Sequence, residues 1–386
     1  MTRFFNRFVA IVTAMLALAY AYVAWRLACG AAANVALAVP FVLVWIVPVL
    51  YWGSDKERHG VLDHALQIAS YVSMGWVSFV VLLTLLRDVA RATGVLLAAA
   101  LDMPAARITL DPAFVPGGAL LVLAVGMLAA FRGPRIRRVD VPIAGLPPVL
   151  HGYRIAQISD LHVGLTLRGP YVRRVVDMIR ALKPDLIVLT GDIVDGPVAR
   201  LASEVQSLSE LPAVAPTYCV VGNHEYYSGI AQWTRQFDAM RLPVLMNTGV
   251  IVHKDGARVL VAGVTDPAAR HYDPQCTPRP DIAAGGHVAD FRLLLAHHPQ
   301  LAPAAEQAGY DLQLSGHTHA GQFFPWTLAV RLVHAPHVAG LSRQGRMWVY
   351  VSAGTGTWGP PVRFGTTPEL TVLRLVRRLG TFDATS

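Results

Sequence analysis

Cysteine is scarce in this chain, with three residues among 386. Cys29, Cys219 and Cys276 lie far apart and share no spacing typical of a thiolate metal site. They also offer no pattern for a disulfide framework, which excludes the class of small disulfide-stabilised secreted domains. A metal site in this protein would therefore use oxygen and nitrogen ligands.

Charged side chains are also few, at 15% of the residues against 54% hydrophobic. This composition is too apolar for an ordinary soluble protein, and the length suggests two structural units. The net charge is +8, but much of it lies at residues 132–138, beside an apolar run, where anionic lipid headgroups are the nearer partner. The second half lacks basic runs interleaved with stacking aromatic residues, so we expect no nucleic-acid partner.

The apolar residues are concentrated in the first third of the chain. Three runs are long enough to cross about 30 Å of hydrocarbon as helices, and a fourth becomes long enough if residues 113–115 join it. Residues 89–101 are too few and are interrupted by Arg91, so we interpret them as an interfacial segment or loop. We predict an all-α region over residues 1–138 with about four transmembrane helices, at residues 8–25, 35–52, 65–86 and 116–131.

The first apolar run has two alternative interpretations, a signal peptide and a lipoprotein signal. Its length exceeds that of a typical signal-peptide core, and Trp25-Arg26-Leu27 makes a poor cleavage site. Cys29 follows Leu27-Ala28, but Arg26 occupies a position where a lipoprotein signal requires an apolar residue. A membrane-spanning helix remains the favoured interpretation.

Basic residues near the apolar runs predict the orientation in the membrane. With four spans, eight basic residues share the side of the N-terminus and four share the other side. We therefore predict a multi-pass protein of the inner membrane, with the segment after residue 138 in the cytoplasm; one span more or fewer would reverse that side. The two sets are Arg3, Arg7, Lys56, Arg58, Arg132, Arg135, Arg137 and Arg138 against Arg26, Arg87, Arg91 and Arg107.

Metal-ligating side chains recur in the second half, each time directly after an apolar run typical of a buried strand. Five runs end in this way, and chance placement of all five is improbable. The residues concerned are Asp160 and His162 after 155–159, Asp192 after 186–190, Asn223, His224 and Glu225 after 219–221, His297 and His298 after 293–296, and His317 and His319 after 312–315.

In this order the motifs D-x-H, G-D, G-N-H-[DE], a lone His and G-H-x-H resemble the calcineurin-like metallophosphoesterase superfamily, over about residues 153–375. Residues 351–361, together with Pro368-Glu369-Leu370, resemble its membrane-associated branch. That branch includes bacterial enzymes resembling the UDP-2,3-diacylglucosamine pyrophosphatases of lipid A synthesis. Ala320 stands where relatives often have glycine, and we expect its methyl group to be harmless.

The resemblance implies a centre with two divalent metal ions, of which manganese is favoured and iron or zinc also suit the ligands. Such a pair neutralises phosphoryl oxygens and lowers the pKa of a bridging water, whose hydroxide attacks the phosphorus. The resemblance assigns Asp160, His162 and His319 to one metal, Asn223, His297 and His317 to the other, and Asp192 to a bridge between them.

Further roles concern the substrate. The resemblance makes His224 a catalytic residue beside the metals, together with Asp192, because an imidazolium can donate a proton to the leaving group. We expect Glu225 to orient His224. Arg363 is a candidate phosphate contact or a surface residue, and His298 is a second candidate contact. The predicted substrate-binding residues are Asn223, His224 and Arg363.

The fold class that we predict is α/β. Helical stripes at residues 170–182, 201–211 and 230–237 alternate with apolar runs, and a hairpin and further strands follow. Two sheets packed face to face with helices outside account for this mixture, and the resemblance implies the same α/β/β/α sandwich. We expect a linker at 139–150, a catalytic domain at 151–380 and a substrate-entrance loop at 266–286.

These observations predict a membrane-anchored phosphodiesterase or pyrophosphatase, a metal-dependent hydrolase that acts on a lipid-linked phosphate beside membrane lipids. An alternative keeps the enzyme but gives it a soluble nucleotide or phosphoprotein as substrate. A non-catalytic receptor or scaffold is a third hypothesis, although the complete ligand set disfavours it. The fourth is a transporter or sensor, which the near absence of ionisable residues within the spans disfavours.

Overall fold

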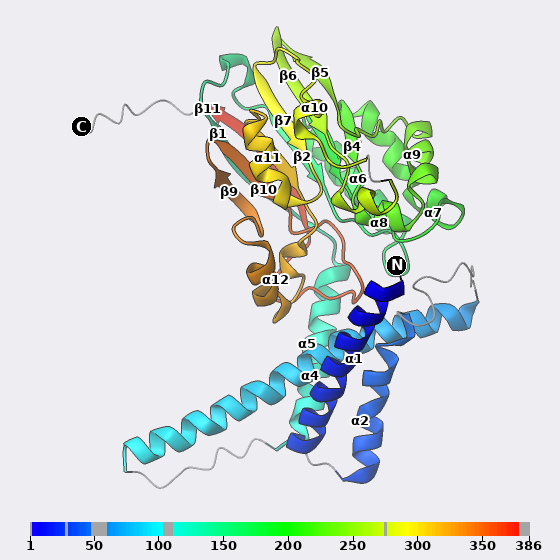
Figure 1. Ribbon diagram of the computed structural model, residues 1–386, viewed down its shortest axis with the longest axis vertical. Coiled ribbons are helices and arrows are strands. Elements are labelled where there is room, and N and C mark those ends of the chain that lie inside the picture. Colours follow the sequence, from blue (N-terminus) through cyan, green and yellow to red (C-terminus); the bar gives the residue numbers. More distant parts are fainter. Residues whose placement is uncertain (1, 28–29, 48–59, 103–110, 274–275, 378–386) are drawn as a thin grey trace. The chain divides into compact units, whose positions relative to one another are not determined.

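The structure is a computed structural model that describes residues 2–27, 30–47, 60–102, 111–273 and 276–377. It divides into two compact units. The first unit comprises residues 1–128 with 359–362, and the second comprises residues 129–358 with 363–386. Figure 1 shows a helical region and a region of two sheets, which we describe separately.

The helical region contains α1 (Thr2–Leu27), α2 (Ala31–Leu43), α4 (Val61–Ala100) and α5 (Phe114–Phe131). Among the described residues, three helices are long and apolar enough to cross a membrane, and they match the first, third and fourth predicted spans. The second predicted span differs, because α2 has only 13 residues and a turn follows it. The end of that predicted span lies outside the described residues.

Of the two interpretations of residues 89–101, an interfacial segment or a loop, helix α4 excludes the loop for residues 89–100. The helix runs without a break over 40 residues to Ala100, about 60 Å at 1.5 Å per residue and therefore about twice the thickness of the hydrocarbon layer. Leucine, alanine and arginine are strong helix formers, and an exposed Arg91 does not interrupt a helix as it interrupts an apolar run.

An ion pair joins two helices of the helical region, just beyond the ends of the first and third predicted spans. Asp88 of α4 accepts hydrogen bonds from Tyr22 Oη at 2.7 Å and from Arg26 Nε at 2.6 Å, both on α1. All three side chains are partly buried. Pairing lowers the cost of these charges in an apolar environment.

The second unit contains two mixed sheets. The five-stranded sheet has the order β1-β11-β2-β3-β4, and the six-stranded sheet has the order β5-β6-β7-β8-β10-β9. The strands of the first are β1 (Arg135–Ile143), β2 (Arg154–Ile158), β3 (Leu186–Thr190), β4 (Thr217–Val220) and β11 (Glu369–Arg377); those of the second are β5 (Thr248–Lys254), β6 (Ala257–Gly263), β7 (Phe291–Leu295), β8 (Leu312–Ser315), β9 (Gly340–Gln344) and β10 (Met347–Val351).

The two sheets pack face to face, with helices on their outer faces (Figure 1). A core between the sheets joins Ile155 and Val188 of the first sheet to Val261 and Leu293 of the second. A second core lies under α6 (Gly169–Leu182), α7 (Val198–Val205) and α9 (Ile230–Ala239), and a third under α10 (Pro280–Ala283) and α11 (Ala302–Gln307). The predicted α/β/β/α sandwich is therefore confirmed.

Strand β1 differs from the linker that we expected at residues 139–150. It pairs in parallel with β11, and its side chains Val141 and Ile143 are buried. The alternation of buried and exposed residues in β1 is short, and its partner β11 begins more than 200 residues later. Local sequence therefore gives no sign of the pairing. The expected entrance loop likewise contains a 3-10 turn at Pro267–His271 and the short helix α10.

The direction of the strands positions the five motifs. β2, β3 and β4 are mutually parallel, as are β6, β7 and β8. The carboxyl ends of parallel strands lie at the same edge of a sheet, and ligand sites of α/β proteins form there. The residues that follow β2, β3, β4, β7 and β8 are therefore brought together at one edge of the sandwich.

Candidate metal centre

The first group of predicted ligands is buried and convergent. Asp160 and His162 follow β2, and His319 follows β8. The Nε2 atom of His319 lies 3.3 Å from Oδ1 of Asp160 and 2.9 Å from Nε2 of His162. The three residues can each direct one ligand atom to a common point. This is the first of the two metal sets that we expected from sequence.

The second group is formed by Asp192, His297 and His317, whose ligand atoms also converge. Asp192 Oδ2 lies 3.1 Å from Nε2 of His297 and 3.8 Å from Nε2 of His162, which belongs to the first group. The Asp192 carboxylate therefore lies between the two groups, as a bridging ligand must.

Two glycines make this approach of loops possible. A Cβ atom on Gly222 would lie 2.2 Å from Oδ1 of Asp192, and one on Gly316 would lie 2.1 Å from Oδ2 of Asp160. Both distances are far inside van der Waals contact. The glycines of G-N-H-E and G-H-x-H are thus required by the packing of one ligand loop against the next.

The hydrogen bonds of His297 and His162 test whether the residues fit metal ions. His297 Nδ1 lies 2.8 Å from the carbonyl oxygen of Thr190, an acceptor, so that nitrogen carries a proton. In the neutral ring, Nε2 then directs its lone pair at the Asp192 carboxylate, an arrangement that a cation stabilises. His162 is held in the same way through Nδ1, at 2.8 Å from Oδ1 of Asp195.

Two buried atoms of the second set point to the same conclusion. Oδ1 of Asn223 is inaccessible to solvent and has no hydrogen-bond partner among the described residues, and the equally inaccessible Nε2 of His297 lies 3.1 Å from the Asp192 carboxylate. An unsatisfied buried polar atom is costly, so such atoms in a native fold require an explanation. The donor set of carboxylate, imidazole and amide oxygen suits manganese, iron or zinc, and the residues therefore fit divalent cations.

Asp195 is a residue of the centre that the sequence analysis missed. Its Oδ1 lies 2.8 Å from Nδ1 of His162 and 2.7 Å from Nδ1 of His224. We expected Glu225 to orient His224, but Asp195 makes that contact. A carboxylate three residues after a ligand, in the run Gly191-Asp192-Ile193-Val194-Asp195, was the only available signal.

The contact between Asp195 and His224 shifts the pKa of both side chains. Burial lowers the pKa of His224, but the carboxylates of Asp192 and Asp195 outweigh it and raise the pKa to about 9. Burial raises the pKa of Asp195, and the imidazoles of His162 and His224 outweigh it and hold the pKa well below its usual range. A charged pair of Asp195 and His224 is consistent with the short contact between them.

Glu225 has a different role, because its carboxylate connects two ligand loops. It accepts hydrogen bonds from four buried backbone N–H groups, those of Asp192 (2.9 Å), Ile193 (2.7 Å), Val194 (3.2 Å) and Gly222 (2.7 Å). The loop after β3 is thereby fixed to the loop after β4. Asp192 and Asn223 depend on this connection for their relative position.

The surroundings of His224 include two aromatic rings. The ring centroid of His224 lies 5.5 Å from that of Tyr227 and 6.0 Å from that of Trp358. Tyr227 is 64% exposed and Trp358 is 39% exposed. His224 itself is partly accessible to solvent, with 17% of its side chain exposed.

Arg363 is buried, and its guanidinium donates to main-chain carbonyl groups. The shortest of these contacts joins Nη2 to the carbonyl oxygen of Gly356 at 2.6 Å, and Nη1 donates to that of His319 at 3.2 Å. Nη2 also lies 3.3 Å from Nδ1 of His319. Arg363 thus holds the loop that contains His319 through hydrogen bonds. Its contact with a substrate phosphate stays a prediction.

The sequence of this chain is similar to a family model and to several known proteins. A family model described as calcineurin-like phosphoesterase matches residues 153–321. A transmembrane protein with metallophosphoesterase domain from Bos taurus is 35% identical over 281 residues, which is 70% of this chain and 63% of that relative. An uncharacterized metallophosphoesterase from Campylobacter jejuni is 30% identical over 262 residues, which is 66% of this chain and 68% of that relative. The chain belongs to the calcineurin-like metallophosphoesterase family.

These matches cover only part of this chain and part of each relative. The metallophosphoesterase family model includes all predicted ligands from Asp160 to His319, whereas Arg363 lies beyond it. The chain spans 63% and 59% of the length of the Bos taurus and Danio rerio relatives. A solved calcineurin-like phosphoesterase from Bacillus subtilis is 16% identical, with a TM-score of 0.34, and the match covers 51% of this chain and 87% of that one.

Several predicted ligands of this metallophosphoesterase have an unusual backbone conformation. Five of them lie in the left-handed region, which costs a residue other than glycine about 1 kcal/mol or more. The cost of Ala320, at φ 54°, is similar, so our expectation of a harmless methyl group was wrong in energetic terms. The five ligands are Asp160 (φ 51°), His162 (49°), Asp192 (52°), His317 (70°) and His319 (50°).

We expect Asp195→Asn in this metallophosphoesterase to lower kcat and weaken metal affinity by about 10- to 100-fold each, because residues that hold a metal-ligating imidazole have effects of this size. Metal affinity is measured by titration and kcat by steady-state hydrolysis. Asp177→Asn, at an exposed carboxylate on α6, is the control and should leave both values unchanged. Normal metal affinity in Asp195→Asn would contradict the role assigned through His162.

Proposed function

We propose that the chain is a membrane-anchored phosphoesterase that hydrolyses a phosphate ester or anhydride, as a phosphodiesterase or pyrophosphatase. The observation that carries the proposal is the position of the Asp192 carboxylate, 3.1 Å from His297 and 3.8 Å from His162, between two convergent ligand sets. When bound at these sets, two divalent ions, with manganese favoured, neutralise phosphoryl oxygens and activate the attacking water.

The residues of the chain complete this chemistry. Asp160, His162 and His319 hold one ion, Asn223, His297 and His317 hold the other, and Asp192 bridges them. His224 donates a proton to the leaving-group oxygen, and Asp195, at 2.7 Å from its Nδ1, keeps the ring in position. The partial exposure of His224 supports this role, because a substrate can reach it from solvent.

A lipid-linked phosphate is the substrate class that we favour. The three apolar helices keep the catalytic unit at a membrane, where a lipid substrate is concentrated. The exposed rings of Tyr227 and Trp358 beside His224 provide an apolar contact for such a substrate. We also propose that the protein is multi-pass in the inner membrane and that the catalytic unit is cytoplasmic, on the strength of the basic residues near the apolar runs.

The same two rings favour a second candidate, a soluble nucleotide. Aromatic side chains stack on nucleobases as readily as they contact acyl chains. The two candidates differ in the part of the substrate that the rings bind, so they are distinguished by substrates that share a phosphate but differ in the attached group.

The test is hydrolysis by the detergent-purified chain after removal of metal with a chelator and after addition of Mn²⁺. We expect activity on bis-(p-nitrophenyl) phosphate to fall to background after metal removal and to return with Mn²⁺, because Asp192, His297 and His162 need a cation between them. Comparing UDP-diacylglucosamine with UDP-glucose tests the lipid part. Equal activity with and without metal, confirmed by elemental analysis, would contradict the proposal.

A further inference from the structure

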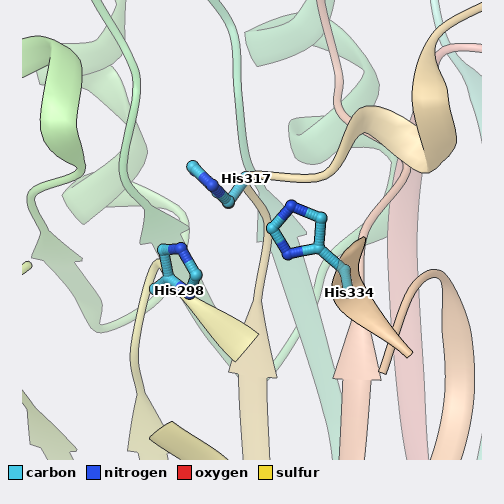
Figure 2. A group of neighbouring side chains, drawn as sticks. All are labelled: His298, His317 and His334. Carbon is cyan, nitrogen blue, oxygen red and sulfur yellow. The ribbon is translucent and has the colours of Figure 1, made fainter. Parts of the chain in front are cut away.

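Three histidines, His298, His317 and His334, form a cluster (Figure 2). His298 follows β7, His317 follows β8, and His334 is the last residue of α12 (Trp326–His334). The ring centroids of His298 and His317 lie 4.1 Å apart, and that of His334 lies 5.7 Å from His298 and 5.4 Å from His317. Each ring can direct a nitrogen to within 4.8 Å of the other two.

Two nitrogens of this cluster lack a hydrogen-bond partner within the described part of the chain. Nδ1 of His298 and Nδ1 of His334 are inaccessible to solvent, and neither makes a hydrogen bond to a described residue. The rings themselves are half-buried. The group of three rings contains no carboxylate, and two of its ring nitrogens are unsatisfied. This arrangement is expected of a set of neutral imidazole ligands.

The chemistry of the set selects the ligand. Three imidazoles suit zinc, copper or nickel ions, whereas magnesium and calcium require oxygen ligands. Three histidines with an open fourth position are also a known arrangement for zinc. The predicted catalytic ligands differ from this set because both of their groups contain a carboxylate.

We propose that His298, His317 and His334 form a second kind of metal site, an outer site that binds Zn²⁺ or a similar nitrogen-preferring cation. His317 also belongs to the catalytic group with Asp192 and His297. A neutral imidazole has one lone pair, so His317 serves one cation at a time. A cation in the outer site therefore removes a ligand from the catalytic centre and inhibits the enzyme.

The existence of the outer site is tested by metal binding alone, independently of the proposed function. In the full-length, detergent-purified chain, Asp160→Asn with Asp192→Asn removes the carboxylates of the catalytic centre. We expect this chain to retain one equivalent of Zn²⁺ and, with Co²⁺ as a probe, the visible absorption of a tetrahedral nitrogen site. Adding His334→Ala should remove both the equivalent and the absorption.

The controls separate a lost ligand from a lost fold. His334→Gln and His298→Gln keep the size of the side chain, and both should lose the zinc equivalent with an unchanged melting temperature. His253→Ala, at an exposed histidine of β5, should keep it. Retention of the same zinc equivalent in both His334 variants would overturn the proposal.

The inhibitory effect rests on the proposed function and has its own test. Zn²⁺ added to the Mn²⁺-loaded enzyme should inhibit wild type and His253→Ala at the same concentration, and His334→Gln should require at least tenfold more. Equal inhibition of all three would show that the outer site, even if it binds zinc, does not compete for His317. If the purified protein has no hydrolytic activity, the zinc-binding measurements still test the outer site.

Discussion

Asp192→Asn is expected to lower hydrolysis by about 10²- to 10³-fold, since the loss of one preorganised electrostatic group at a reacting centre has effects of this size. Oδ2 of Asp192 lies between the two ligand groups, 3.1 Å from His297 and 3.8 Å from His162. Asparagine keeps the shape and can still accept the hydrogen bond from the backbone N–H of His224 at 2.9 Å. The amide NH2 group then takes the place of Oδ2, so the negative charge and one ligand oxygen are lost without a change of shape.

Two quantities decide this prediction, the metal content of the purified chain and its kcat in saturating Mn²⁺. We expect fewer than two metal equivalents and an activity that added Mn²⁺ does not restore. Asp238→Asn, at an exposed carboxylate on α9, is the matched control. A variant of Asp192 with both equivalents and near-normal kcat would rule out a bridging carboxylate.

Glu225→Ala should destabilise the second unit by about 4 kcal/mol or more, because each buried N–H left without an acceptor costs about 1–3 kcal/mol. Glu225 is fully buried and accepts from the backbone of Asp192, Ile193, Val194 and Gly222. Alanine leaves all four groups unsatisfied and adds a cavity. Because domains of this kind are stable by about 5–15 kcal/mol, the variant is expected to be marginally folded.

Denaturant unfolding in detergent measures this effect, and a chelator present throughout separates it from any loss of metal. Glu210→Ala is the control, because Glu210 pairs with Arg173 and Arg180 at the surface and its removal should leave the transition midpoint unchanged. An equal midpoint for Glu225→Ala and wild type would mean that water replaces the carboxylate.

The sequence was sufficient to predict the sandwich and the strand ends that carry the ligands. Buried parallel strands read as continuous apolar runs, as in residues 186–190, and the first polar residue after each run marks the edge of the sheet. The sequence alone therefore predicts that Asp192 and Asn223 lie at one edge of the sheet. That both ligand groups converge follows from the parallel direction of the strands.

Other features depend on contacts that local sequence does not encode. Asp195 contacts His162 and His224 because the chain turns after Asp192, and no spacing rule predicts that turn. Strand β1 forms because β11 lies beside it, far away in the chain. His334 belongs to no sequence motif, and its ring meets that of His298 only because the nine-residue helix α12 ends beside it.

The left-handed backbone at five ligands has a consequence for how this protein can change. Glycine would relieve the conformational strain at Asp160 or His319, but it would remove a ligand atom at the same step. Such a substitution can raise thermal stability and inactivate the centre at the same time. Laboratory evolution of a more heat-resistant variant therefore needs an activity screen in every round.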